Sequence, residues 1–166
     1  MSLITLGGNP TNTAGVLPNI GSKAADFSVT DADLNDITLN DFSGKRVVLN
    51  IFPSINTGVC AASVREFNKR AAALSNTVVI CLSRDLPFVH KGFCAAEGID
   101  HVISASSYKN NSFSDNYPVL ILDGKFEGLF SRAVIVIDEN GVVKYTEQVP
   151  EIGQEPDYDK VIAALA

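Results

Sequence analysis

Residues 53–60, Pro-Ser-Ile-Asn-Thr-Gly-Val-Cys, decide how the chain on either side of them folds. The preceding residues 46–52 are apolar and β-branched, which predicts a buried strand. Pro53 ends that strand because it has no N–H group to give to a sheet, and a helical pattern follows from Cys60 onward. The sequence therefore predicts a cysteine in the first turn of a helix, just past the end of a central strand.

The start of a helix is a favourable place for a reactive cysteine. Unpaired backbone N–H groups and the positive end of the helix dipole stabilise an anion there, and the thiolate anion is the reactive form of cysteine. The alternative is that Cys60 is a buried and unreactive side chain, as many free cysteines are.

The rest of the chain alternates strands with helices. Apolar runs predict strands at residues 46–52, 77–83, 101–104, 133–138 and 142–146. Apolar spacings of three and four predict helices at residues 60–74, 86–98 and 157–166, and residues 109–116 are interpreted as a polar helix or loop. Hairpins are expected over residues 3–17 and 27–39. This order predicts one α/β domain over residues 1–166, with a mixed central sheet flanked by helices and an N-terminal β-hairpin.

Composition excludes some classes of function. The chain has 166 residues, of which 46% are hydrophobic and 19% charged, as in an ordinary globular protein. The net charge of -6 disfavours nucleic-acid binding, which needs a basic face. No apolar run is long enough to cross a membrane and no signal segment opens the chain, so a cytoplasmic protein without a membrane partner is expected.

The cysteines and histidines do not have metal-ligand spacing. Cys60, Cys81 and Cys94 form no Cys-x-x-Cys pair, and His90 and His101 stand apart from them, so neither a metal nor a cofactor is expected. In a reducing compartment, catalytic or redox-cycling use of cysteine is favoured over a static disulfide. Cys81 lies inside a predicted strand and is interpreted as a small core residue. Both histidines are interpreted as surface or helix-end residues rather than as bases for Cys60.

The spacing Pro53-x-x-x-Thr57-x-x-Cys60 resembles the active-site signature of the peroxiredoxins. The longer stretch 53–68 is similar to the thiol peroxidases, the atypical two-cysteine peroxiredoxins of bacteria. Three more stretches, residues 93–98, 132–138 and 155–158, resemble the same group in the same order, so the resemblance covers nearly the whole chain.

This resemblance implies a thioredoxin-like fold, a homodimer, and reduction of hydroperoxides with thioredoxin as the electron donor. Cys60 would be the peroxidatic cysteine and Cys94 the resolving cysteine of the same subunit. Pro53, Thr57 and Arg132 would complete the active site. Two positions depart from the usual pattern of the group: Asn56 stands in place of Asp, and Pro118 in place of Gly.

A low thiol pKa alone does not make a fast peroxidase. Lowering a cysteine pKa from about 8.5 to about 6 raises its thiolate fraction roughly 30-fold at neutral pH, but nucleophilicity falls roughly tenfold. The remaining acceleration must come from donors that stabilise the departing oxygen. The N–H groups of residues 58–60, the Thr57 hydroxyl and the Arg132 guanidinium are the candidates. The alternatives are a helix N-cap for Thr57 and a solvated surface side chain for Arg132.

Cys60 and Cys94 lie on separate predicted helices. A disulfide between them requires Cα atoms within about 7 Å, so we expect the first turn after Cys60 and part of residues 86–98 to unwind in each cycle. Two other functions remain open from the residues alone. One is a peroxide sensor that passes its oxidation to a partner, and the other is a binding module of the holdase type in which Cys60 is incidental.

Overall fold

The apolar runs form one mixed sheet in the computed structural model, which describes residues 3–166. Within these residues the sheet has seven strands in the order β4-β3-β7-β6-β5-β8-β9. Their bounds are Ser28–Asp31 (β3), Asp36–Thr38 (β4), Arg46–Ile51 (β5), Thr77–Ser83 (β6), Ile103–Ser106 (β7), Ala133–Ile137 (β8) and Val143–Gln148 (β9). The central strand β5 is parallel to β6 and antiparallel to β8, which confirms the expected mixed sheet.

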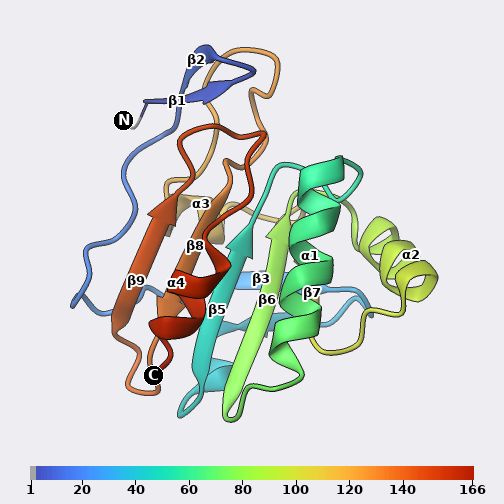
Figure 1. Cartoon of the computed structure of the whole chain (residues 1–166), viewed down its shortest axis with the longest axis vertical. Helices are drawn as coiled ribbons and strands as arrows, with labels where there is room; N and C mark the ends of the chain where they lie inside the picture. The colour runs from blue at the N-terminus through green and yellow to red at the C-terminus, as the bar shows by residue number, and fades with distance from the viewer. Residues whose placement is uncertain (1–2) are drawn as a thin grey trace.

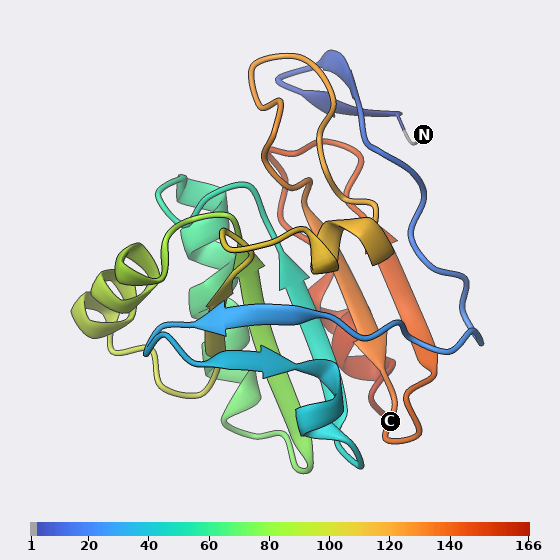
Figure 2. The ribbon, with the colours of Figure 1, turned by 180° about the vertical axis from the view of Figure 1, so that it is seen from behind.

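Helices cover both faces of this sheet. Helices α1 (Gly58–Ala71) and α4 (Tyr158–Ala163) lie on the face toward the viewer in Figure 1, and α2 (Pro87–Glu97) lies beside α1. The opposite face carries α3 (Ser112–Asn116). Figure 2 shows this face, with β3, β4 and the short 3₁₀ helix η1 (Leu39–Phe42) toward the viewer. No helix within residues 3–166 is long and apolar enough to span a membrane.

Burial on both faces explains the uninterrupted apolar sequence of β5. Val47, Leu49 and Ile51 join the core under α3, whereas Val48 joins the core under α1 and α4. Asn50 also points to the second face, where it is fully buried. A strand that is covered on both sides has no solvent face, and its sequence therefore does not alternate.

The N-terminal hairpin consists of β1 (Leu3–Leu6) and β2 (Asn9–Asn12), paired antiparallel. Its turn is formed by Gly7 and Gly8, whose positive φ angles of 58° and 79° suit a two-residue hairpin turn. The second arm was expected at residues 11–17, and this placement is wrong, because pairing already begins at Asn9 and ends at Asn12. The hairpin lies at the end of the molecule above β5 and β8 in Figure 1.

Most other boundaries agree with the sequence to within two residues. β6 covers the predicted residues 77–83, and α2 begins with Pro87 and ends before Gly98, which takes the left-handed conformation with φ 66°. β7 lies two residues later than the predicted strand 101–104. α1 begins at Gly58 rather than at Cys60, so Cys60 is the third residue of the helix.

Candidate active site

Cys60 lies in the first turn of α1, directly beyond the carboxyl end of β5, as the sequence predicted. Its side chain is 0% exposed. The first N–H groups of a helix have no carbonyl partner within the helix, so the backbone of residues 58–60 presents donors next to this sulfur. The environment can therefore stabilise negative charge on the thiol or on a group bound beside it.

Arg132 is brought to Cys60 by the register of the sheet. Ala133, the first residue of β8, pairs with Ile51, the last residue of β5, so the residue before β8 lies beside the chain that leaves β5. Arg132 is 2% exposed, and its Nη2 donates to Cys60 Sγ at 3.2 Å. The alternative of a solvated surface side chain is therefore wrong.

The guanidinium of Arg132 is held at one end and has a spare donor at the other. Its Nε donates to the carbonyl oxygen of Ile152 at 2.8 Å, which fixes the plane of the group. Its Nη1 is buried and has no hydrogen-bond partner within the described residues. Leaving a buried donor unpaired is costly, so a donor in this position is suited to a ligand oxygen that arrives during function.

Thr57 and Pro53 complete the loop that enters α1. Thr57 occupies the N-cap position, but its side chain makes no capping hydrogen bond. The hydroxyl instead donates to the carbonyl oxygen of Ser54 at 3.1 Å. Since a hydroxyl has one proton and two lone pairs, Thr57 Oγ1 remains available as an acceptor in the same turn as Cys60. Pro53 is buried at the start of the loop, where its ring excludes solvent.

A buried set of hydrogen bonds also connects the Cys60 backbone to strands β5 and β6. Ser63 Oγ donates to the Cys60 carbonyl oxygen at 2.7 Å, and Asn50 Nδ2 donates to Ser63 Oγ at 3.2 Å. Asn50 Nδ2 also donates to Cys81 Sγ at 3.6 Å. Cys81 is fully buried, and burial raises the pKa of its thiol to about 12. This environment keeps Cys81 protonated, which confirms its interpretation as a core residue.

Cys94 is not brought to Cys60. It lies on α2, is partly buried, and its sulfur contacts Ser104 Oγ on β7 at 3.2 Å. All three cysteines are free. The structure therefore unites Cys60, Arg132, Thr57 and Pro53 at one place and leaves Cys94 on a neighbouring helix.

His90 is the clearest correction to the sequence analysis. It was interpreted as a surface or helix-end residue, but it is 0% exposed on the inner side of α2. Burial lowers the pKa of its imidazole, although the charge of Asp85 opposes this effect. His101 is exposed, as expected, and lies 3.4 Å from the carboxylate of Asp100.

The sequence analysis did not single out a contact beside this site, between Ser54 and Asp85. Ser54 Oγ donates to Asp85 Oδ1 at 2.8 Å, and the N–H of Ile55 donates to Asp85 Oδ2 at 2.8 Å. One signal was present in the sequence. Both residues follow neighbouring parallel strands, β5 and β6, and the carboxyl ends of parallel strands meet at the same edge of a sheet.

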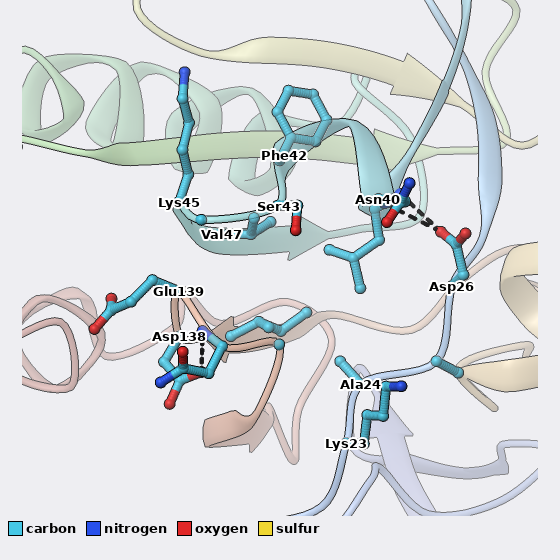
Figure 3. A pocket seen from close by; sticks show the side chains of 16 residues that line it. Lys23, Ala24, Asp26, Asn40, Phe42, Ser43, Lys45, Val47, Asp138 and Glu139 are labelled. Carbon is cyan, nitrogen blue, oxygen red and sulfur yellow. Dashed lines mark hydrogen bonds between the residues drawn. The ribbon is translucent and has the colours of Figure 1, made fainter.

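A pocket of about 770 Å³ lies at the opposite end of the sheet, lined by the start of β5, the end of β8 and the connector before β3 (Figure 3). Two of its acidic groups are already engaged, since Asp26 accepts from the N–H of Leu39 at 2.9 Å and Asp138 accepts from the N–H of Asn140 at 2.9 Å. Neither Cys60 nor Arg132 lines this pocket. Cys60 and this cavity are therefore at different ends of the sheet.

Comparisons with known proteins agree on one family. The Redoxin family model matches residues 19–162. Thiol peroxidases of Mycobacterium bovis and Mycobacterium tuberculosis are each 53% identical to this chain over 165 residues, which is 99% of this chain and 99% of each relative. A solved structure of a peroxiredoxin-like protein from Aquifex aeolicus has a TM-score of 0.92 at 34% identity and covers 97% of this chain and 94% of its own. The thiol peroxidase from Chromobacterium violaceum shares the fold, with a TM-score of 0.89 at 21% identity over 97% of this chain and 93% of its own.

The chain therefore belongs to the Redoxin family, in its thiol peroxidase group, as the sequence resemblance predicted. Its fold is the thioredoxin-like fold of the peroxiredoxins, with the expected N-terminal hairpin. Membership of this group supports a thiol-dependent peroxidase activity.

Proposed function

We propose that this protein reduces hydrogen peroxide and alkyl hydroperoxides through Cys60, and that thioredoxin returns it to the reduced state. Cys60 is the peroxidatic cysteine and Cys94 the resolving cysteine of the same chain. Arg132, Thr57 and Pro53 form the rest of the active site, and no cofactor takes part.

In the first step the thiolate of Cys60 attacks one oxygen of the hydroperoxide. A sulfur–oxygen bond forms, the oxygen–oxygen bond breaks, and the second oxygen leaves with the electron pair and takes up a proton as water or an alcohol. Cys60 is thereby oxidised to a sulfenic acid. In this proposal Arg132 Nη1, which is unpaired in the structure, donates to the leaving oxygen as its charge develops, and Thr57 Oγ1 accepts from the hydroperoxide O–H.

In the second step the thiol of Cys94 attacks the sulfenic sulfur. A disulfide forms between Cys60 and Cys94, and the hydroxyl group leaves as water. A dithiol of the thioredoxin class then exchanges with this disulfide through a mixed disulfide, so that thioredoxin is oxidised and both cysteines of this chain are reduced. Each cycle consumes one hydroperoxide and one dithiol.

The contact between Arg132 and Cys60 is the observation that carries this proposal. Both side chains are buried, and the 3.2 Å distance from Nη2 to Sγ means that a permanent positive charge lies beside the sulfur. An arginine costs free energy to bury, and its spare Nη1 donor has no structural partner within the described residues. A purely structural cysteine does not need either feature.

Steady-state turnover and mass spectrometry test the proposal together. With thioredoxin, thioredoxin reductase and NADPH, the wild-type protein is expected to consume many equivalents of hydrogen peroxide, and Cys60→Ser to consume none. One equivalent of peroxide should give an intramolecular Cys60–Cys94 disulfide. A single turnover without recycling would favour the peroxide-sensor alternative. Undiminished function of Cys60→Ser would favour the binding-module alternative, and a disulfide through Cys81 would overturn the role of Cys94.

Three further proposals concern the whole protein, and the first of them rests on the same resemblance. We infer a homodimer, one domain over residues 1–166, and a cytoplasmic location. Light scattering on the purified protein tests the first of these, because a mass of one chain at micromolar concentration would exclude the dimer.

A further inference from the structure

A buried polar chain connects α2 to the loop that precedes Cys60. His90 lies one helical turn before Cys94 on α2, and its Nε2 is 3.0 Å from Ser83 Oγ, at the end of β6. Ser83 Oγ donates to Asp85 Oδ2 at 2.6 Å. The carboxylate of Asp85 in turn accepts from Ser54 Oγ and from the N–H of Ile55, both at 2.8 Å.

The protons of this chain can be assigned from its geometry. Ser83 has one hydroxyl proton, and the 2.6 Å distance to a carboxylate oxygen requires that this proton point to Asp85. Ser83 Oγ then accepts from His90, so His90 carries its proton on Nε2. His90 Nδ1 is left as an acceptor, and it has no partner within the described residues. The imidazole is therefore held by one directed hydrogen bond and by its edge-on packing against Phe52, with ring centroids 6.2 Å apart.

The far end of the chain sets the shape of the catalytic loop. With the Ser54 side chain held by Asp85, the Ser54 carbonyl oxygen accepts from both the N–H and the hydroxyl of Thr57, each at 3.1 Å. The direction of Thr57 Oγ1, and the entry of the chain into the first turn of α1, therefore depend on Asp85.

We propose that His90, Ser83 and Asp85 form a positioning relay, which keeps the loop at residues 54–57 in its peroxide-reactive shape while α2 is folded and releases it when α2 unwinds to deliver Cys94. This inference rests on the proposed roles of Cys60 and Cys94. The relay joins α2, which unwinds in the proposed cycle, to the loop that leads into the first turn of α1, and it runs through three buried or half-buried side chains.

Thermodynamic reciprocity gives the relay its function. If folded α2 stabilises the reactive loop by some factor, the reactive loop stabilises folded α2 by the same factor. Weakening the relay should therefore have two opposite kinetic effects. The loop loses its reactive shape and attacks peroxide more slowly, whereas α2 unwinds more readily and the disulfide forms faster.

Two substitutions at His90 separate this role from simple packing. His90→Leu keeps an apolar side chain of similar size but removes the donor to Ser83, and His90→Gln restores an N–H donor on an uncharged side chain. Rapid mixing with hydrogen peroxide, quenching with a thiol alkylating reagent, and mass spectrometry give the rate of Cys60 oxidation and the rate of Cys60–Cys94 bond formation from one experiment. His90→Leu is expected to slow Cys60 oxidation by about threefold or more and to speed disulfide formation by a similar factor. His90→Gln is expected to restore both rates.

A control on the same helix loosens α2 without touching the loop. Arg65 Nη2 donates to Glu97 Oε1 at 2.8 Å and its Nε donates to Oε2 at 3.2 Å, an exposed bidentate pair that ties the end of α2 to α1. Glu97→Gln weakens this pair. It is expected to speed disulfide formation while it leaves the rate of Cys60 oxidation unchanged.

The outcomes discriminate among the explanations. Opposite changes in the two rates for His90→Leu, with only the second changed for Glu97→Gln, support the relay. A His90→Leu protein that melts at a lower temperature but keeps both rates shows that His90 is only a packing residue, and the relay is then wrong. If His90→Leu does not fold, Ser83→Ala breaks the same link and is judged by the same two rates. Failure of the proposed function is a separate result, because the wild-type protein itself would then form no Cys60–Cys94 disulfide with hydrogen peroxide.

Discussion

At the scale of single residues, Arg132 combines a positive charge with several hydrogen-bond donors that point in different directions. Its Nε is bound to the Ile152 carbonyl oxygen, its Nη2 to the Cys60 sulfur, and its Nη1 is unpaired. The planar guanidinium presents these donors in fixed directions, whereas the ammonium group of lysine is a point charge on a flexible stem. The site therefore depends on the geometry of the group as well as on its charge.

Replacing Arg132 by lysine tests this dependence. Arg132→Lys is expected to lower the second-order rate of Cys60 with hydrogen peroxide by about 100-fold or more, the effect of losing one oriented donor at a developing oxyanion. Arg70→Lys is the matched control, because Arg70 lies at the far end of α1 in ion pairs with Glu66 and Asp159. Its rate should equal that of the wild type. A rate for Arg132→Lys within a few-fold of wild type would show that charge alone is sufficient.

At the scale of elements, the N-terminal hairpin supports the active site from a distance. The N–H groups of Gly7 and Gly8 donate to the Glu151 carboxylate at 2.8 Å and 3.1 Å, and the Thr5 hydroxyl also donates to it. The backbone of Thr5 also pairs with the residues on both sides of Glu151. Its N–H donates to the carbonyl oxygen of Pro150 at 2.8 Å, and its carbonyl oxygen accepts from the N–H of Ile152 at 2.9 Å. Ile152 provides the carbonyl oxygen that orients Arg132, so the hairpin stabilises the segment that holds the Arg132 guanidinium.

The docking of the hairpin should depend on pH. Hydrogen bonds from Thr5, Gly8 and Gly7 lower the pKa of the Glu151 carboxyl from its ordinary value of 4.5 to about 2. A carboxyl whose pKa is lower in the folded state stabilises the fold above pH 4.5, and this contribution disappears as the pH falls from about 4.5 to about 2. The free energy of unfolding of Glu151→Gln should therefore be lower than that of the wild type at pH 7, and the difference should shrink toward pH 2.

Urea unfolding at several pH values measures this difference. Glu139→Gln, at an exposed glutamate in the turn between β8 and β9, is the control and should follow the wild type at every pH. Glu151→Gln should also oxidise Cys60 a few-fold more slowly at pH 7, because Ile152 is less firmly held. A stability difference that is independent of pH would mean that the negative charge of Glu151 does not hold the hairpin.

Elements were predicted well where their sequence is dominated by burial. β6 was found with both ends correct because residues 78–82 form an unbroken apolar run between Thr77 and Ser83. α1 was found because its apolar spacing is regular, although it begins two residues earlier than predicted. β7 was displaced by two residues because Ser104 and Ser106 are buried polar residues that the hydrophobic pattern does not reveal. His90 was misplaced for the same reason, since its single buried partner, Ser83, belongs to another element.

The site was only partly accessible from sequence. Cys60 follows from local chemistry, because a strand, a proline and a helix start are all visible in one stretch. Arg132 depends on the pairing of Ala133 with Ile51, a register that residue patterns do not give, and it was found only through the family resemblance. The catalytic roles of these residues stay predictions, as does that of Cys94.

At the scale of the whole molecule, the proposed disulfide between Cys60 and Cys94 requires a second state besides the reduced one. Cys60 is buried in the first turn of α1, and Cys94 contacts Ser104 from α2. A disulfide needs Cα atoms within about 7 Å, and each cysteine is fixed in a different helix. The energy of opening must therefore be small for these two segments and large for the sheet, whose central strands β5, β6 and β8 are covered on both faces.

Hydrogen exchange of the reduced and the oxidised protein measures which segments open and which stay closed. After one equivalent of hydrogen peroxide, the amides of residues 58–61 and of α2 should lose protection, whereas those of β5, β6 and β8 should keep it. Cys94→Ser supplies the control, because it can form the sulfenic acid but not the disulfide, and its α2 should remain protected. Equal protection of both segments in the reduced and oxidised wild type would exclude unwinding, and the two cysteines would then have to meet by a rigid shift of α2. Loss of protection throughout the sheet would instead mean that the sheet itself opens in each cycle.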